Sequence, residues 1–212
     1  MAVSFRDEAP QVIKEYLFYL ETIKIKSKKT VDEYYIDLRT FFRYLKKSRK
    51  LVSDDTEFEN IKIDDVDIDL IKSVTLNDAY EYMDYLYRER NNQSAARARK
   101  CSSLKGFFDY LYSKKHLISN NPISQLEVPK RKKALPKYLT LEQSIELLNA
   151  VEGKYKERDY AILTLFLNCG LRVSEMSGLN YTDIRNDNTM RVVGKGNKER
   201  IVYLNSACID AI

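Results

Sequence analysis

The sequence of 212 residues predicts a mainly α-helical protein with one small antiparallel β element, divided into two domains. Two patterns predict this fold class. Before residue 121, four stretches repeat apolar side chains at three- and four-residue steps, which is typical of amphipathic helices that pack together. Near the end of the chain, two β-prone runs flank GKGNK, a turn sequence that favours a hairpin.

The composition indicates a globular protein in which basic residues are concentrated in parts of the sequence. Hydrophobic residues make up 44% and charged residues 32%, with a net charge of +5. Residues 24–50 carry ten Lys and Arg against three acids, whereas residues 54–69 carry eight acids, so we expect one anion-facing surface. Three widely spaced cysteines favour a reducing cytoplasm over a disulfide framework or a zinc site. The chain shows no signal peptide and no membrane-length apolar run, which predicts a cytoplasmic protein without a membrane partner.

The first domain is expected over residues 1–121, as four helices. They begin near Ala9, after the N-cap Ser27, after a capping box at Thr75, and after Ser94. The acidic segment 51–73 is expected to be a solvated loop with at most one short strand, and no function is assigned to it. The basic side chains on the second and fourth helices are expected to stay in solvent: Arg39, Arg43, Lys46, Lys47, Arg97, Arg99, Lys100 and Lys105.

A proline-containing basic stretch, residues 122–137, predicts a linker to a second domain over residues 138–212. That domain should open with a capping box at Thr140. An apolar stretch, residues 160–168, predicts a buried helix that stops at Gly170. A helix from Arg172 to Leu179 and the hairpin follow. The chain ends just as another helix begins, which favours a truncated domain. The first helix of this domain should contribute a core stripe: Leu141, Ile145, Leu148 and Val151.

Two cations in the second domain are candidates for binding one anion. Arg172 lies at a helix start, where unpaired N–H groups and a guanidinium both favour phosphate oxygens. The alternative is a structural ion pair with Glu175, three residues along. Lys195 lies on the glycine-rich turn, from which it could follow a phosphate and protonate a leaving oxygen. The alternative for Lys195 is an exposed hairpin without chemistry. Lys198 and Arg200 would contact the phosphate backbone.

The chain contains GLRVSEMSGLNYTDI and GKGNKERIVYL, and the first lysine of the second motif follows the arginine of the first by 23 positions. Together these motifs resemble the tyrosine recombinase (phage integrase) family, in particular its bacterial Xer-like branch. SKKTVDEYYIDLRTFFRYL resembles the family segment S-x-x-T-x-x-x-Y-x-x-D-L-x-x-F. The resemblance implies a four-helix core-binding (SAM-like) domain, followed by the N-terminal part of an α+β catalytic domain. It assigns catalysis to Arg172 and Lys195, with Glu175 in support. DNA contacts in the first domain are expected, by the same resemblance, at Lys26, Lys28, Thr30, Tyr34, Arg97 and Lys100.

The resemblance implies site-specific recombination of double-stranded DNA at an inverted-repeat site, without a cofactor or metal. A tyrosine attacks a DNA phosphate to form a 3′-phosphotyrosyl link, and the intact protein acts as a homo- or hetero-tetramer on DNA. The family's His-x-x-Arg motif and nucleophilic tyrosine have no match here. The only histidine, His116, lies in the first domain without an arginine three residues later. The 212-residue chain is therefore expected to bind DNA without cleaving it.

Two alternatives remain open at this point. The chain could be a natural non-catalytic DNA-binding regulator or decoy that occupies recombination sites. A native stop codon after Ile212 would favour that hypothesis, whereas a downstream His-x-x-Arg and tyrosine in frame would favour a recombinase fragment. The chain could also be a helical interaction domain that does not touch DNA, and steeply salt-dependent duplex binding would count against this.

Overall fold

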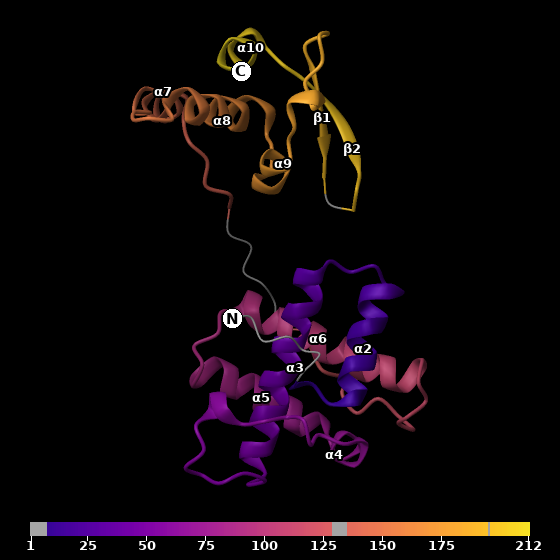
Figure 1. Cartoon of the computed structure of the whole chain (residues 1–212). Helices are drawn as coiled ribbons and strands as arrows, with labels where there is room; N and C mark the ends of the chain where they lie inside the picture. Colours follow the sequence, from indigo (N-terminus) through magenta and orange to yellow (C-terminus); the bar gives the residue numbers. More distant parts are fainter. Residues whose placement is uncertain (1–7, 129–134, 195) are drawn as a thin grey trace. The chain divides into compact units, whose positions relative to one another are not determined.

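The computed structural model describes residues 8–128, 135–194 and 196–212. The chain divides into two compact units, residues 1–134 and 135–212 (Figure 1). Each unit has its own hydrophobic core. The first unit is helical, and the second adds one antiparallel hairpin to short helices. The predicted fold class is therefore confirmed. Among the described residues, no helix is both long and apolar enough to cross a bilayer.

Four long helices build the first unit: α2 (Gln11–Thr22), α3 (Lys28–Ser48), α5 (Leu76–Arg88) and α6 (Ser94–Ser113). The expected caps hold two of their starts. Ser27 Oγ accepts from Thr30 N at 3.3 Å, and Thr75 forms a reciprocal capping box with Asp78. The apolar faces meet in an aromatic core that includes Phe41, Phe42, Tyr82, Phe107 and Phe108.

The acidic segment 51–73 is not a solvated insertion, and that expectation is wrong. It contains a short 3-10 turn (Phe58–Asn60) and the helix α4 (Ile68–Lys72), and we find no strand in it. Its acids face outward because the residues between them are core residues that pack on the helices. The buried side chains of the segment are Ile61, Ile63, Val66 and Ile71.

Two basic residues of α3 hold this segment instead of facing solvent, which corrects a second expectation. Arg43 Nε donates to Ile61 O at 2.8 Å, and its Nη1 donates to Glu59 at 2.9 Å. Lys46 Nζ donates to Lys62 O at 2.9 Å and to both carboxylate oxygens of Asp65. Both side chains are almost completely buried. Their long methylene stems cross the core while the charged ends reach acceptors on the acidic segment.

Lys100 of α6 is buried too, because it lies against a carboxylate inside the first unit. Asp37 of α3 is fully buried and accepts from Lys100 Nζ at 3.0 Å, Arg99 Nη1 at 2.7 Å and Ser103 Oγ at 2.7 Å. Ionised groups are rarely buried unless they are paired and hydrogen-bonded, and this cluster meets both conditions. The α3–α6 contact is therefore fixed by charge as well as by apolar packing.

The first unit continues into the residues that were expected to form the linker. Ile123 and Leu126 are buried in its core, and Lys105 Nζ donates to the carbonyl oxygens of Ser124 and Leu126. The predicted linker therefore begins too early in the sequence. The proline and lysine residues of this stretch predicted a domain boundary, but the burial of Ile123 and Leu126 extends the first unit beyond Pro122. Residues 129–134, with the lysine-rich run, lie outside the described residues.

The second unit contains α7 (Leu141–Asn149), α8 (Lys156–Cys169), α9 (Val173–Ser177), a 3-10 turn (Tyr181–Asp183) and α10 (Ser206–Ala211). Strands β1 (Thr189–Val193) and β2 (Glu199–Tyr203) pair antiparallel, with Val192 opposite Arg200. Gly170 ends α8 at φ 59°, a left-handed conformation that suits glycine. The core lies between α8, α10 and the inner face of the hairpin.

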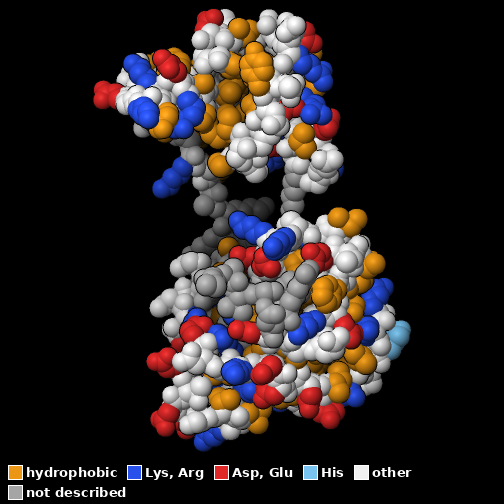
Figure 2. Space-filling model, viewed as in Figure 1, with side chains coloured by type: hydrophobic (Ala, Val, Ile, Leu, Met, Phe, Trp, Pro, Cys, Tyr) orange, Lys and Arg blue, Asp and Glu red, His pale blue; other side chains and the backbone are white. Residues whose placement is uncertain are grey.

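The helix α7 does not contribute the core stripe that the sequence predicted. Leu141 is 72% exposed and Ile145 is 50% exposed, and of the stripe only Val151, just beyond the helix end, is buried. The apolar face of α8 is likewise only partly covered, since Leu167 also remains exposed. Figure 2 shows hydrophobic side chains on the surface of this unit. Among the described elements, α7 packs mainly on α8, which leaves its other side uncovered.

Candidate phosphate-binding site

Glu175 is the centre of the polar cluster in the second unit. It lies in α9, a helix of a single short turn that begins directly after Arg172. The helix is shorter than the predicted 172–179 segment because Gly178 follows it at once. Arg172 is thus the N-cap residue, with extended backbone, and its N–H donates to Glu175 Oε2 at 2.8 Å. This bond closes the turn and fixes the carboxylate beneath the arginine.

Four donors converge on the Glu175 carboxylate. Besides the Arg172 N–H, Arg172 Nη1 donates to Oε1 at 2.7 Å. Arg200, on strand β2, donates from Nη1 to Oε1 at 2.7 Å and from Nη2 to Oε2 at 2.9 Å. The carboxylate side chain is only 1% exposed. The bidentate bond from Arg200, followed by the Arg172 N–H, lowers the pKa of Glu175 from the ordinary 4.5 to about 2.

Arg172 keeps most of its guanidinium open to solvent. Its side chain is 70% exposed, although its Nη1 is held by Glu175. Among the described residues, no acceptor is hydrogen-bonded to its Nε or Nη2. An oriented guanidinium with unused N–H groups is suited to binding two oxygens of a phosphate. The ion pair and the phosphate-binding hypothesis are therefore compatible, because the carboxylate uses only one of the three nitrogens.

The hairpin approaches this cluster through a glycine. A Cβ added to Gly194 would lie 3.1 Å from Glu175 Oε1, so a larger residue would press on the carboxylate. Gly194 N donates to Lys198 O at 2.7 Å, which closes the turn. Gly196 and Asn197 both have positive φ, as the turn sequence predicted. Lys198 is exposed at the turn. Lys195 lies outside the described residues, so its catalytic role stays a prediction.

The DNA contacts predicted in the first unit lie in two places, around the start of α3 and on α6. Lys26 and Lys28 are exposed at the start of α3, with Thr30 half-buried beside them, and Thr30 Oγ1 is 2.9 Å from Ser27 Oγ. Tyr34 is half-buried and packs on the core. Lys26 and Tyr34 line the same shallow groove, of about 300 Å³.

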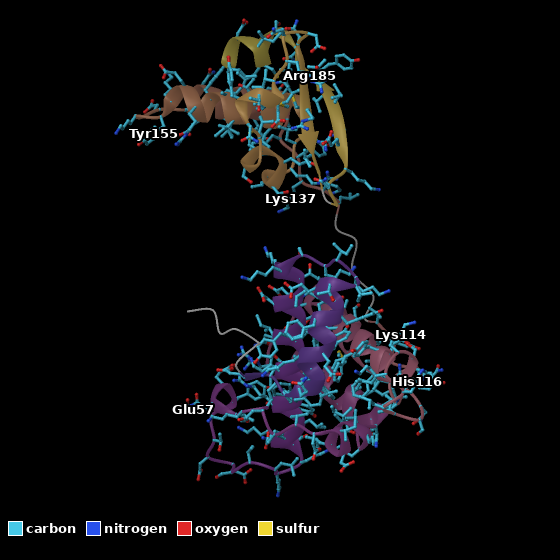
Figure 3. All side chains as sticks on the ribbon, turned by 45° about the vertical axis from the view of Figure 1, so that its right-hand side comes forward. Glu57, Lys114, His116, Lys137, Tyr155 and Arg185 are labelled. Carbon is cyan, nitrogen blue, oxygen red and sulfur yellow. The ribbon has the colours of Figure 1, made fainter. Side chains whose placement is uncertain are left out.

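Two cations at this groove were not singled out as contacts from the sequence. Lys24 and Lys114 line it together with Lys26. Lys24 belongs to the basic run of residues 24–50, and that run is the only sequence signal for it. Lys114 follows α6 directly, close to His116 in the chain (Figure 3). The fold places residues 24 and 114 at one groove because Tyr16 of α2 packs on Phe107 and Tyr110 of α6, with ring centres 5.4 and 5.2 Å apart.

Arg97 and Lys100 differ in what they can offer a ligand. The Arg97 guanidinium lies 4.7 Å from the centre of the Tyr87 ring, and its Nε is buried without a hydrogen-bond partner among the described residues. Lys100 is bonded to Asp37, as described above. The structure therefore leaves Arg97 with unsatisfied donor capacity and commits Lys100 to the interior of the unit. Their DNA contacts stay predictions.

These features define a class of protein with two units. The first unit is helical and has exposed lysines at the start of α3. In the second unit, a hairpin and a short helix present Arg172, which the buried Glu175 holds. Residues 137–212 match the phage integrase family. The chain is 55% identical over 203 residues to tyrosine recombinase XerC of Caldanaerobacter subterraneus subsp. tengcongensis, covering 96% of this chain and 57% of that protein. It is 34% identical to tyrosine recombinase XerD of Pasteurella multocida over 83% of this chain and 53% of that protein.

Residues 137–212 therefore carry a phage integrase domain, and almost the whole chain is similar to tyrosine recombinases. Solved structures support the fold. The XerH recombinase bound to palindromic difH substrate aligns with a TM-score of 0.64 at 19% identity, covering 94% of this chain and 55% of that one. A lambda integrase tetramer bound to a Holliday junction aligns with a TM-score of 0.62 at 15% identity, covering 93% and 52%. The chain thus spans between half and two thirds of the length of these relatives.

Proposed function

We propose that this chain is the DNA-binding and phosphate-holding part of a site-specific DNA recombinase that works through a 3′-phosphotyrosyl intermediate. Its partner is double-stranded DNA at an inverted-repeat site, where the intact protein acts as a tetramer. The similarity to tyrosine recombinases supports this proposal, and so do the similar folds that were solved on a palindromic substrate and on a Holliday junction. The observation that carries it is Arg172: an exposed guanidinium that Glu175 orients but only partly occupies.

The chemistry follows from where charge develops. When an oxygen nucleophile attacks a DNA phosphate, negative charge grows on the non-bridging oxygens, and a fixed guanidinium stabilises it without reorganising. Arg172 supplies that guanidinium. Glu175 stays ionised at neutral pH because its pKa is about 2, so it holds Arg172 throughout the reaction. Lys195 is assigned the proton for the leaving 5′-oxygen. The attacking tyrosine is not assigned to any residue of this chain, and we expect the 212-residue chain to bind DNA without forming a covalent link.

Duplex binding at several salt concentrations tests this proposal. With phosphate contacts at Lys26, Lys28, Arg172, Lys195 and Lys198 alone, the slope of log K against log salt should be near ~−4.5, because each contact contributes about −0.9; contacts at Arg97 or Lys100 would steepen it. Fluorescence anisotropy with a palindromic duplex would measure the slope. Arg172→Ala should make it shallower by about 0.9. Absence of binding even at low salt would contradict the proposal and would favour a helical interaction domain.

A further inference from the structure

The sequence placed Arg200 among the phosphate contacts, but its geometry points to another task. Both terminal nitrogens of Arg200 are bonded to Glu175, at 2.7 and 2.9 Å, in the two-pronged arrangement that suits guanidinium and carboxylate. Its side chain is 39% exposed, against 70% for Arg172. The two arginines share one carboxylate, and only Arg172 retains a terminal nitrogen that bonds no described residue.

We propose that Arg200 is a positioning residue, which joins the hairpin to α9 and leaves Arg172 to bind the DNA phosphate. The proposal rests on the function proposed above. Arg200 of β2 bonds Glu175 of α9, which lies 25 residues earlier in the sequence. The same carboxylate lies against Gly194, the residue before Lys195. Loss of the Arg200 bonds would free the hairpin from α9 and would leave Arg172 as the only cation on a buried carboxylate.

The charges of the cluster explain why a second arginine is needed. A buried carboxylate is costly unless it is paired and hydrogen-bonded, and Arg172 bonds Glu175 with only one of its side-chain nitrogens. Arg200 supplies two hydrogen bonds and one positive charge, so the cluster of Glu175, Arg172 and Arg200 carries a net charge of +1. That excess lies on the exposed Arg172. Removing Arg200 would make the cluster neutral without removing any group that touches DNA.

Two measurements on the 212-residue chain separate positioning from contact. The first is amide hydrogen exchange across the hairpin, including the Gly194 N–H. Arg200→Gln should speed exchange there at least about 10-fold, because the bonds to α9 are lost. The second is the salt slope of duplex binding. Arg200→Gln should weaken affinity while leaving the slope within ~0.3 of the wild-type value, whereas Lys198→Gln, at a proposed contact, should make it shallower by about 0.9.

Arg191 provides a matched control on the same hairpin. It forms a comparable arginine–carboxylate pair with Asp183, at 2.9 and 2.8 Å, but has no bond to Glu175. Arg191→Gln should loosen β1 locally without the affinity loss of Arg200→Gln. In a Glu175→Gln background, Arg200→Gln should have less than a third of its effect on log affinity, since the shared partner is already altered.

The outcomes decide between the two proposals. If Arg200→Gln makes the salt slope shallower by about 0.9 and leaves hairpin exchange unchanged, Arg200 is a phosphate contact and the positioning role is wrong. If hairpin exchange rises but wild-type chain does not bind duplex at any salt concentration, the bridge to α9 stands and the DNA function fails. Equal effects of Arg200→Gln in the wild-type and Glu175→Gln backgrounds would also overturn the positioning role.

Discussion

Asp37→Ala should strongly destabilise the first unit. The Asp37 side chain is 0% exposed and accepts from Lys100 Nζ, Arg99 Nη1 and Ser103 Oγ at 2.7 to 3.0 Å. Lys100 is only 10% exposed, so the substitution leaves a buried ammonium without a carboxylate. Breaking a buried pair by removing one partner costs about 3–5 kcal/mol, and we expect a loss of stability in that range.

Urea unfolding followed by circular dichroism at 222 nm would measure this loss, because most helices belong to the first unit. Asp84→Ala is the matched control. Asp84 pairs with Arg88 at 2.7 Å on the surface of α5, and their side chains are 58% and 72% exposed. Exposed pairs one helical turn apart contribute about 0.3–0.5 kcal/mol. If Asp37→Ala cost no more than this control, the reasoning that the buried carboxylate holds α3 to α6 would be refuted.

Three further predictions concern the second unit. Because the pKa of Glu175 is lowered to about 2, its contribution to stability is complete above pH ~4.5 and is lost as the pH falls toward 2; Glu175→Gln should remove that part of the acid unfolding curve. Gly194→Ala should cost about 1–3 kcal/mol in urea unfolding, since its Cβ would lie 3.1 Å from a carboxylate held by four donors, whereas Gly178→Ala, with 3.4 Å to its nearest neighbour, should cost less. Gly170→Ala should lower the free energy of unfolding by about 1–2 kcal/mol through its positive φ alone, because the added Cβ would have no neighbouring atom within 4 Å. An unchanged melting curve would contradict this.

The sequence was sufficient for the elements whose signals are local. The helices behind Ser27, Thr75 and Thr140 begin where side-chain caps predicted, and the GKGNK turn forms the hairpin. The pairing of Arg172 with Glu175 was also foreseen from their spacing, although the two meet as the N-cap residue and the third helical residue and not on one helical face. Periodicity and capping act over a few residues, so they can be read without knowing the fold.

Contacts between distant residues could not be predicted in this way. Lys46 and Lys100 looked like solvated charges, because a helical pattern does not show which neighbour will supply a buried acceptor. The same applies to Ile61, which is surrounded by acids in the sequence but is buried in the structure. The sequence also could not reveal that both terminal nitrogens of Arg200 bond Glu175, which lies 25 residues earlier.

Covalent capture on a nicked suicide substrate tests the central claim most directly. The full reading frame that contains this chain should form a protein–DNA adduct, and Arg172→Ala should slow its formation at least about 100-fold, the usual effect of removing one group that stabilises developing charge. The 212-residue chain alone should form no adduct. An Arg172→Ala protein that forms adduct at the wild-type rate would contradict the assignment of Arg172 to the scissile phosphate. An adduct with the 212-residue chain would contradict the expectation that it carries no nucleophile.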